Sequence, residues 1–448
     1  MNLTVHPGHA LRGELVLPGD KSLSHRAALF GALAEGKSVI ENFLVSGVTA
    51  AMLDCLDALG VTWAIKEGAL YVDSPGWQAL PAPGRALNCG NSATTLRLMA
   101  GALAAAGVPA VLDGSPGLRK RPMGRILEPL IQMGVPVESA EGGCAPIRLG
   151  QRSLHQPLTA IEYTLPVASA QVKSCLLLAA LAAGGPVTLH EPGLSRDHTE
   201  RMLAHMGVVV RRYSLPGRPG PSVTLTPPTR PLRPLRMRLP GDFSSAAFLI
   251  VAALITPGSD VWLREAGLNP TRTGMLDVLQ EMGANIQVVS KGERAGEPVG
   301  DLHIRYAPLQ AGSVSGDRVV RMIDEFPAFA VAACFAEGLT QVKDAAELRY
   351  KESDRIAWLC AELKGLGADM SESPDGFAIR GGSGLRGGRV DPHGDHRLAM
   401  ALAVAGLAAG EPVLVQGAEI MAESFPEFGE VLQSLGAEMT LEAVPDEA

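Results

Sequence analysis

The sequence is poor in aromatic residues, in paired cysteines and in positive charge. Phe, Trp and Tyr make up 4% of the 448 residues, and the six cysteines are scattered without CxxC spacing. The formal net charge of −8 argues against a general surface for nucleic acid or anionic membranes. Gly, Pro or charged residues interrupt every apolar stretch before it reaches membrane-spanning length. These absences predict reduced cysteines and a basic site that is local.

What is present is the composition of a folded protein with two domains. Hydrophobic residues make up 46% of the chain and charged residues 19%, and 448 residues exceed what one core usually serves. Residues 1–10 contain no basic segment followed by an apolar run, so we expect a cytoplasmic protein. Residues 1–17 alternate enough to predict one initial strand.

A pattern of a polar turn, a small-residue helix, a β-prone segment and a second helix ending in Gly occurs six times. The predicted small-residue helices begin near Ser22, Asn91, Ala168, Phe243, Glu325 and His396. The predicted second helices end at Gly60, Gly134, Gly207, Gly283, Gly367 and Gly436. Two openings, residues 17–20 and 239–242, both read LPGD, which indicates duplication with three repeats in each domain.

Residues 17–26 form the strongest local motif. Pro18-Gly19 supplies turn chemistry, Asp20 or Ser22 can cap the helix that follows, and Lys21 and Arg26 flank its start. Backbone N–H groups at a helix start favour an anion, and the two cations strengthen that preference. The motif predicts a phosphate site, and the alternative for these residues alone is a solvated basic helix start.

Further charged residues follow in both halves. The run from Arg119 to Arg125 holds four cations in seven residues without interleaved aromatic residues, which favours a small anion over nucleic acid. Asp324 precedes an almost uncharged helix and could act as a base. Lys351, Glu352 and Arg355 are spaced for one helix, with an i,i+3 salt bridge as the structural alternative.

Two His-containing clusters raise the possibility of a metal. In residues 391–397, Arg397 would repel a dication, and no further ligand follows at the usual spacing. In residues 195–200 no HExxH helix is present, so helix capping and a charge network are the preferred interpretation. We therefore predict no metal at either cluster.

Ten segments in this order resemble 5-enolpyruvylshikimate-3-phosphate (EPSP) synthase: LPGDKSLSHR, GNSATTLR, KRPMGR, ASAQVKS, RDHTE, NPTRTG, MIDEFP, KESDR, DHR and SFPEF. Four of their elements, GDK, SAQxK, RxHxE and NxTR, resemble the family's second class, which is associated with glyphosate tolerance. The resemblance implies an inside-out α/β barrel fold in two domains, each of three βαβαββ-type repeats. The expected domains are 1–19 plus 241–448 and 20–240, with hinges near Pro18–Asp20 and Leu239–Asp242.

The resemblance also implies the reaction and the residues that perform it. The enolpyruvyl group of phosphoenolpyruvate would move to the 5-hydroxyl of shikimate 3-phosphate through a tetrahedral intermediate, releasing phosphate. The resemblance implies that this reaction needs no metal and no organic cofactor. The implied catalytic residues are Asp324, Glu352 and Lys21. The implied ligands of shikimate 3-phosphate are Lys21, Ser22, Arg26, Ser169, Ala170, Gln171, Arg196, Asp324 and Lys351. Those of phosphoenolpyruvate are Lys21, Asn91, Ala93, Arg121, Gln171, Glu352, Arg355, His396 and Arg397.

Three positions depart from the common pattern of the family. Ala93 stands where the common class has Gly, and its methyl group would crowd glyphosate, so we expect weak inhibition by that herbicide. Glu423 stands where the common class has Lys, so one cation is missing or supplied elsewhere. Val48 stands where many relatives carry an acid at a helix start, for which the sequence offers no reason.

Three alternatives stay open at this point. UDP-N-acetylglucosamine enolpyruvyl transferase shares the implied fold, but it is expected to carry a Cys in the loop that here spans residues 114–125, where none occurs. A non-catalytic repeat scaffold would have no reason to place acids and phosphate-type cations at helix starts in both halves. A metallohydrolase would use residues 391–396. The family suggests a monomer that binds neither nucleic acid nor membrane.

Overall fold

The computed structural model describes residues 1–443, and the chain divides into two compact units. Unit 1 comprises Met1–Pro18, Pro240–Gly292 and the chain from Pro298 onward, and unit 2 comprises Gly19–Leu239 and Glu293–Glu297. Each unit has a separate hydrophobic core.

Unit 2 contains three four-stranded sheets. Their strands are β3 (Glu35–Glu41), β4 (Thr62–Lys66), β5 (Ala69–Pro75), β6 (Leu87–Asn88), β7 (Ala110–Asp113), β8 (Val137–Ala140), β9 (Cys144–Leu149), β10 (Glu162–Thr164), β11 (Val187–His190), β12 (Val209–Ser214), β13 (Pro221–Thr226) and β14 (Arg236–Arg238). The strand orders are β14-β3-β5-β4, β6-β7-β9-β8 and β10-β11-β13-β12. In each sheet the first pair is parallel and the other pairs are antiparallel, as a βαβαββ repeat requires.

Unit 1 repeats this plan. Its strands are β1 (Asn2–His6), β2 (Arg12–Val16), β15 (Asp260–Gly267), β16 (Asn285–Arg294), β17 (Glu297–Arg305), β18 (Ser313–Val314), β19 (Gly338–Val342), β20 (Asp369–Ser373), β21 (Gly376–Gly381), β22 (Gly388–Val390), β23 (Val413–Val415) and β24 (Glu438–Glu442). The strand orders are β16-β17-β15-β2, β18-β19-β21-β20 and β22-β23-β1-β24. The six sheets confirm the predicted six-repeat α/β fold.

The α-helices and short 3-10 helices complete the repeats. Those of unit 2 are α1 (Lys21–Leu33), α2 (Gly47–Ala58), η1 (Trp77–Ala79), α3 (Ala93–Ala106), α4 (Pro116–Arg119), α5 (Gly124–Gln132), η2 (Glu141–Gly143), α6 (Ala170–Ala179), η3 (Ala180–Ala182) and α7 (His198–His205). Those of unit 1 are α8 (Phe243–Ile255), α9 (Gly274–Glu281), α10 (Asp317–Arg321), α11 (Phe326–Phe335), η4 (Ala346–Tyr350), α12 (Arg355–Gly365), α13 (His396–Gly406), η5 (Ala418–Glu423) and α14 (Phe428–Ser434).

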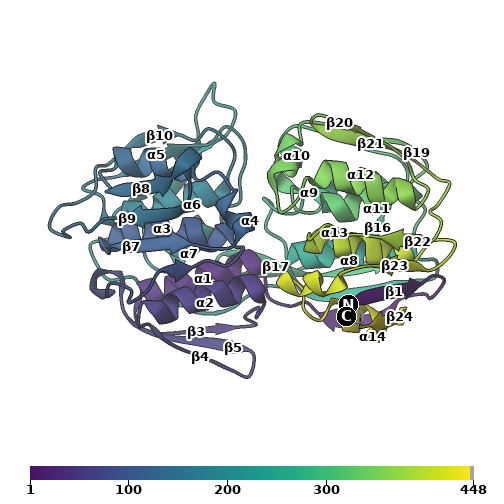
Figure 1. Ribbon diagram of the computed structural model, residues 1–448, viewed down its shortest axis with the longest axis horizontal. Coiled ribbons are helices and arrows are strands. Elements are labelled where there is room, and N and C mark those ends of the chain that lie inside the picture. The colour runs from purple at the N-terminus through teal and green to yellow at the C-terminus, as the bar shows by residue number, and fades with distance from the viewer. Residues whose placement is uncertain (444–448) are drawn as a thin grey trace, which may run out of the picture. The chain divides into compact units, whose positions relative to one another are not determined.

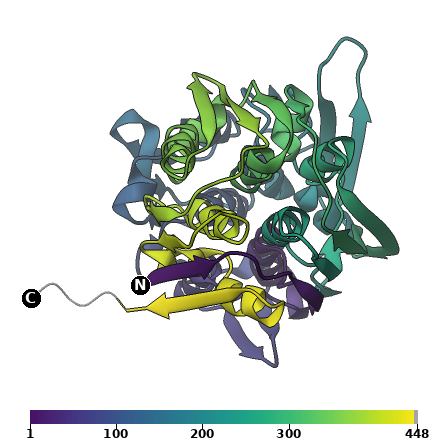
Figure 2. The same cartoon turned by 90° about the vertical axis from the view of Figure 1, so that its right-hand side faces the viewer.

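The first long helix of each repeat is buried nearly all round. In unit 2, α3 packs against α1 and α6 in the interior (Figure 1). In unit 1, α8, α11 and α13 pack against one another. Figure 2 views these helices along their axes, with the strands around them. A helix that is apolar on all faces is stable only in such a core. Sheets therefore lie outside and helices inside.

The predicted helix ends are confirmed, and the predicted initial strand is wrong in one respect. The six glycines expected after the second helices all have φ between 67° and 110°, a region that favours Gly. Residues 1–17 form two strands, because Pro7-Gly8 interrupts them and Gly8 has φ 94°. β1 pairs with β23 and β24, whereas β2 pairs with β15. Among residues 1–443, no helix combines the length and apolar character needed to cross a membrane.

Candidate functional site

The starts of the three buried helices of unit 2 present polar groups. Asp20, Ser92 and Ser169 precede α1, α3 and α6, and each accepts a hydrogen bond from a backbone N–H three residues on, at 2.8, 3.1 and 3.4 Å. Such caps fix the first turns, in which Ser22 and Gln171 lie. The helix dipoles make these starts favourable positions for an anion.

Arg26 lies inside unit 2 with its guanidinium fully engaged. Its Nε donates to Thr199 Oγ1 at 2.8 Å, Nη1 to the Ser22 carbonyl at 2.9 Å and Nη2 to Ser174 Oγ at 2.9 Å. Burial lowers the pKa of Arg26 to about 10. Arg196 Nη1 lies 3.5 Å from Ser22 Oγ, so the two arginines bracket one hydroxyl-bearing helix start.

Arg97 is a site residue that the sequence analysis missed. Its Nη1 donates a short hydrogen bond to Gln171 Oε1, while Gln171 Nε2 donates to Thr94 Oγ1 at 2.9 Å. Nη2 donates to the Pro122 carbonyl at 3.0 Å, next to Arg121. Arg97 thus joins α3, α6 and the basic loop. The sequence signal was an arginine one turn into an otherwise small and apolar helix.

The basic loop of unit 2 is partly neutralised. Arg119 Nε donates to Asp113 Oδ1 at 2.8 Å, and this hydrogen bond lowers the pKa of Asp113. Nearby, Ser115 Oγ donates to Asn91 Oδ1 at 3.0 Å, which ties the loop to the turn before α3. One of the four predicted cations is therefore committed to an ion pair.

In unit 1, Asp324 lies among three cations. Lys351 Nζ is 3.3 Å and Arg355 Nη1 is 3.5 Å from Asp324 Oδ1. Arg397 Nη1 donates to the Asp324 carbonyl at 3.1 Å. The Asp324 side chain is 16% exposed, so a substrate can reach a carboxylate that the protein holds in place.

Arg355 connects Asp324 to two further acids. Its Nη2 donates to Glu352 Oε2 at 2.6 Å, and its Nε donates to Asp395 Oδ2 at 2.7 Å. Burial alone would lower the pKa of Arg355, but the carboxylates of Asp395 and Glu352 raise it above its usual range. Burial would raise the pKa of Asp395, and the charge of Arg355 instead holds it low.

The helix expected to contain Lys351, Glu352 and Arg355 begins only at Arg355. Asp354 caps α12 by accepting a hydrogen bond from the Ala357 N–H at 3.0 Å, so Lys351 and Glu352 precede the helix. The i,i+3 salt bridge that the sequence analysis gave as the structural alternative is present between Glu352 and Arg355. The Arg355 side chain is buried and the Glu352 side chain is partly exposed.

The two clusters considered for metals serve other contacts. His393 Nε2 lies 2.8 Å from Glu362 Oε1, and its ring stacks on Trp358 at 3.6 Å. Asp197 pairs with Arg201 at 2.9 Å, which confirms the charge network, but its side chain makes no capping hydrogen bond to α7. Within residues 1–443, no three His, Cys, Asp or Glu side chains gather to hold a metal ion.

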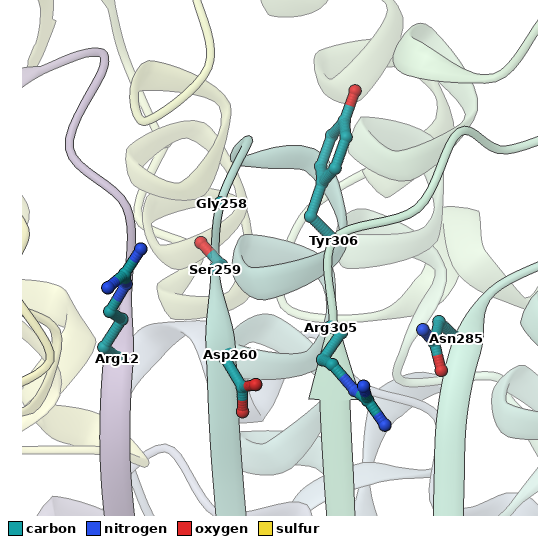
Figure 3. A pocket seen from close by; sticks show the side chains of 7 residues that line it. All are labelled: Arg12, Gly258, Ser259, Asp260, Asn285, Arg305 and Tyr306. Carbon is teal, nitrogen blue, oxygen red and sulfur yellow. The ribbon is translucent and has the colours of Figure 1, made fainter.

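A separate pocket of about 660 Å³ lies at strand ends of the sheet β16-β17-β15-β2 in unit 1. Its lining residues are Arg12, Gly258, Ser259, Asp260, Asn285, Arg305 and Tyr306 (Figure 3). Figure 3 shows Tyr306 pointing away from Arg305 and Asp260, so the polar groups do not converge. The lining contains none of the residues predicted for the site.

Unit 2 thus presents cations and hydroxyls at helix starts, and unit 1 presents two carboxylates held by cations. Groups of these kinds suit an enzyme that binds small anions and transfers protons. Comparison with known proteins identifies the family. Residues 5–432 match the family described as EPSP synthase (3-phosphoshikimate 1-carboxyvinyltransferase). The chain therefore belongs to the EPSP synthase family, which confirms the predicted resemblance, and it is a transferase.

Individual relatives match over nearly their whole length. The 3-phosphoshikimate 1-carboxyvinyltransferase of Desulforudis audaxviator is 47% identical, over 98% of this chain and 100% of the relative. That of Halorhodospira halophila is 47% identical, over 97% and 96%. The structure of EPSP synthase from Acinetobacter baumannii is 40% identical with a TM-score of 0.86, over 98% and 100%.

Proposed function

We propose that this enzyme transfers the enolpyruvyl group of phosphoenolpyruvate to the 5-hydroxyl of shikimate 3-phosphate, releasing phosphate. This is the EPSP synthase reaction of the shikimate pathway. The observation that carries the proposal is that one buried guanidinium, Arg355, contacts both Asp324 and Glu352. Two carboxylates held by one cation supply a base and an acid within the reach of one small molecule.

In this proposal the two acids have different roles. Asp324 takes the proton from the attacking hydroxyl, and Glu352 delivers a proton to the methylene carbon of phosphoenolpyruvate. The adjacent carbon becomes cationic and is attacked, which gives the tetrahedral intermediate. Phosphate then leaves with the proton that Asp324 took from the hydroxyl, and a methyl proton returns to Glu352, which re-forms the carbon–carbon double bond as the enol ether of the product. Nearby carboxylates stabilise the cationic carbon, and Lys21 assists.

The remaining residues bind the two substrates. Ser22, Arg26, Ser169, Ala170, Arg196 and Lys351 hold shikimate 3-phosphate, and Gln171 contacts both substrates. Asn91, Ala93, Arg121, Arg355, His396 and Arg397 hold phosphoenolpyruvate with Lys21. The helix caps and the Arg97–Gln171 contact support this assignment because they order the helix starts that carry these residues. We also propose that the enzyme acts as a monomer, as the resemblance to the family suggests.

Phosphate release tests the proposed reaction. Purified protein should release phosphate from phosphoenolpyruvate only when shikimate 3-phosphate is present, and a chelator should not change the rate. Asp324→Ala should lower kcat by about 10²- to 10⁴-fold, the usual loss when a general base is removed. Release with UDP-N-acetylglucosamine in place of shikimate 3-phosphate would instead identify the rival transferase.

We further propose that the enzyme belongs to the family's second class and tolerates glyphosate. Ala93 is the first residue of α3 and is 4% exposed, so its methyl group narrows the helix start assigned to phosphoenolpyruvate. Ala93→Gly should lower the glyphosate inhibition constant by about tenfold or more, since one methyl group in a pocket discriminates by about 10- to 200-fold. A low-micromolar constant that Ala93→Gly leaves unchanged would disprove tolerance through this residue.

A further inference from the structure

Glu325, the neighbour of Asp324, points into the core of unit 1. It occupies the residue before α11, yet its side chain makes no capping hydrogen bond. The side chain is fully buried, and its Oε1 accepts a short hydrogen bond from Ser244 Oγ. An acid before a helix normally caps it or faces water. Glu325 does neither, so its burial needs another reason.

The counter-charge of Glu325 is Arg272, from the turn before α9. Arg272 is 2% exposed, and its Nη2 lies 3.8 Å from Glu325 Oε1. The same nitrogen donates to Ser244 Oγ at 2.6 Å and to Asp242 Oδ1 at 3.1 Å. The Arg272 cluster, defined as Arg272, Asp242, Ser244 and Glu325, therefore joins the starts of α8 and α11 to the turn before α9.

The LPGD turn occurs once in each unit, and the residues that follow it differ between the two units. In unit 2 the turn is followed by Lys21 and by Ser22, which is half-buried and contacts Arg196. In unit 1 it is followed by Phe243 and by Ser244, which is 2% exposed. The hydroxyl that we assign to a ligand in unit 2 therefore corresponds to one that is buried and bonded internally in unit 1.

The neighbouring residues Asp324 and Glu325 are held by different partners. The Asp324 carboxylate contacts Lys351 and Arg355, and its carbonyl accepts from Arg397. The next side chain is held by Ser244 on the core side. We propose that Arg272 and Glu325 are positioning residues that fix the Asp324 carboxylate for proton abstraction. The proposal rests on the proposed function, in which Asp324 is the base.

A positioning role and a purely structural ion pair predict different results. A buried ion pair is weak support for stability, because desolvation offsets the attraction. The Arg272–Glu325 ion pair matters here because it fixes geometry, since a small displacement of a reacting group lowers the reaction rate by a large factor. A structural role would change stability alone, whereas a positioning role changes kcat and its pH profile while substrate binding persists.

The test compares Glu325→Gln with Asp301→Asn. Asp301 is an equally buried acid of unit 1, 3% exposed and paired with Arg264 and Lys291 at 2.9 Å. Phosphate release by Glu325→Gln should show kcat about 10- to 100-fold lower with little change in KM. The acid limb of its kcat profile should move to higher pH, because a carboxylate displaced from its cations is protonated more easily. Asp301→Asn should keep the wild-type kcat and profile.

Three further variants keep the proposal falsifiable if Glu325→Gln does not fold. Ser244→Ala removes the hydroxyl link without changing charge and should lower kcat less than Glu325→Gln. Arg272→Lys retains the charge and should restore most of the activity that Arg272→Met loses. A wild-type kcat and pH profile in folded Glu325→Gln or Ser244→Ala would overturn the positioning role alone. If the unmodified enzyme released no phosphate with shikimate 3-phosphate, the proposed function would fall as well.

Discussion

Arg355 shows how a buried cation stays stable beside the proposed catalytic acids. A desolvated guanidinium is costly unless carboxylates compensate its charge, and three of them contact Arg355. Removing one partner of a buried pair typically costs about 3–5 kcal/mol. The same contacts hold the carboxylates of Asp324 and Glu352 against a single guanidinium, that of Arg355. Stability and the spacing of the acids therefore depend on the same residue.

His25 gives unit 2 a pH dependence that can be measured. Its Nδ1 lies 2.8 Å from the Lys21 carbonyl, and its Nε2 lies 3.1 Å from the Val48 carbonyl and 3.3 Å from Ser92 Oγ. Burial lowers the pKa of His25 to about 4. Because the unfolded chain protonates near 6.5, this neutral histidine stabilises the fold above that pH, and the stabilisation is lost as the pH falls toward 4.

The expected loss from His25 between pH 7.5 and pH 5 is about 2 kcal/mol in the free energy of unfolding. Urea denaturation at both pH values should show it, and His25→Asn should reduce the difference by that amount. His155→Asn, at an exposed histidine, serves as the control and should keep the wild-type difference. If His25→Asn keeps the wild-type difference too, the assignment of this pH dependence to His25 is wrong.

Helices α3 and α6 approach each other closely at Gly101. A Cβ atom on Gly101 would lie 2.1 Å from the Cys175 carbonyl oxygen, which belongs to α6. Gly101→Ala must therefore push the helices apart, and overpacking of this kind costs about 1–3 kcal/mol. Because Arg97 bonds Gln171 between the same helices, KM for both substrates should rise as well. Thermal unfolding and steady-state kinetics measure the two effects.

Gly31 of α1 provides the matched control for Gly101. A Cβ there would meet the side chains of Ser38 and Val72 at 3.3–3.4 Å, a tight contact that small shifts relieve. Gly31→Ala should change stability by less than about 1 kcal/mol and leave KM unchanged. Equal losses in the two variants would show that helix propensity or crowding in general, and not the α3–α6 approach, is responsible.

The helices also show which features a sequence reveals. Gly60 and the five equivalent glycines could be predicted, because the residue that ends a helix often adopts the left-handed conformation, which favours Gly. This preference can be read from the neighbouring sequence alone. Lys173 could not be predicted as buried, because its burial depends on Glu191 and Glu200, which lie 2.9 and 2.6 Å away on other elements. Glu325 and Asp395 were missed as partners for the same reason. Local motifs indicate the residues that we propose face a ligand, and tertiary contacts identify the residues that hold them.

For the whole molecule, the charge distribution and the path of the chain set the conditions for function. The net charge is −8, so attraction of dianionic substrates must come from the cations gathered at helix starts. Each unit has its own core, and the chain passes between the units at Pro18–Gly19, at Leu239–Pro240 and at both ends of Glu293–Glu297. The proposed ligands of shikimate 3-phosphate are divided between the units. Substrate binding is therefore expected to involve both.

Hydrogen exchange with saturating shikimate 3-phosphate tests this division. Amide exchange should slow at the starts of α1 and α6 and around Arg196 in unit 2, and also around Asp324 and Lys351 in unit 1, because ligand contacts suppress local opening. Inorganic phosphate at the same concentration is the ligand control, and it should protect less of the chain. Lys351→Met should lose the protection in unit 1 and keep that in unit 2. Protection confined to one unit in the unmodified enzyme would show that the assignment of ligands to both is wrong.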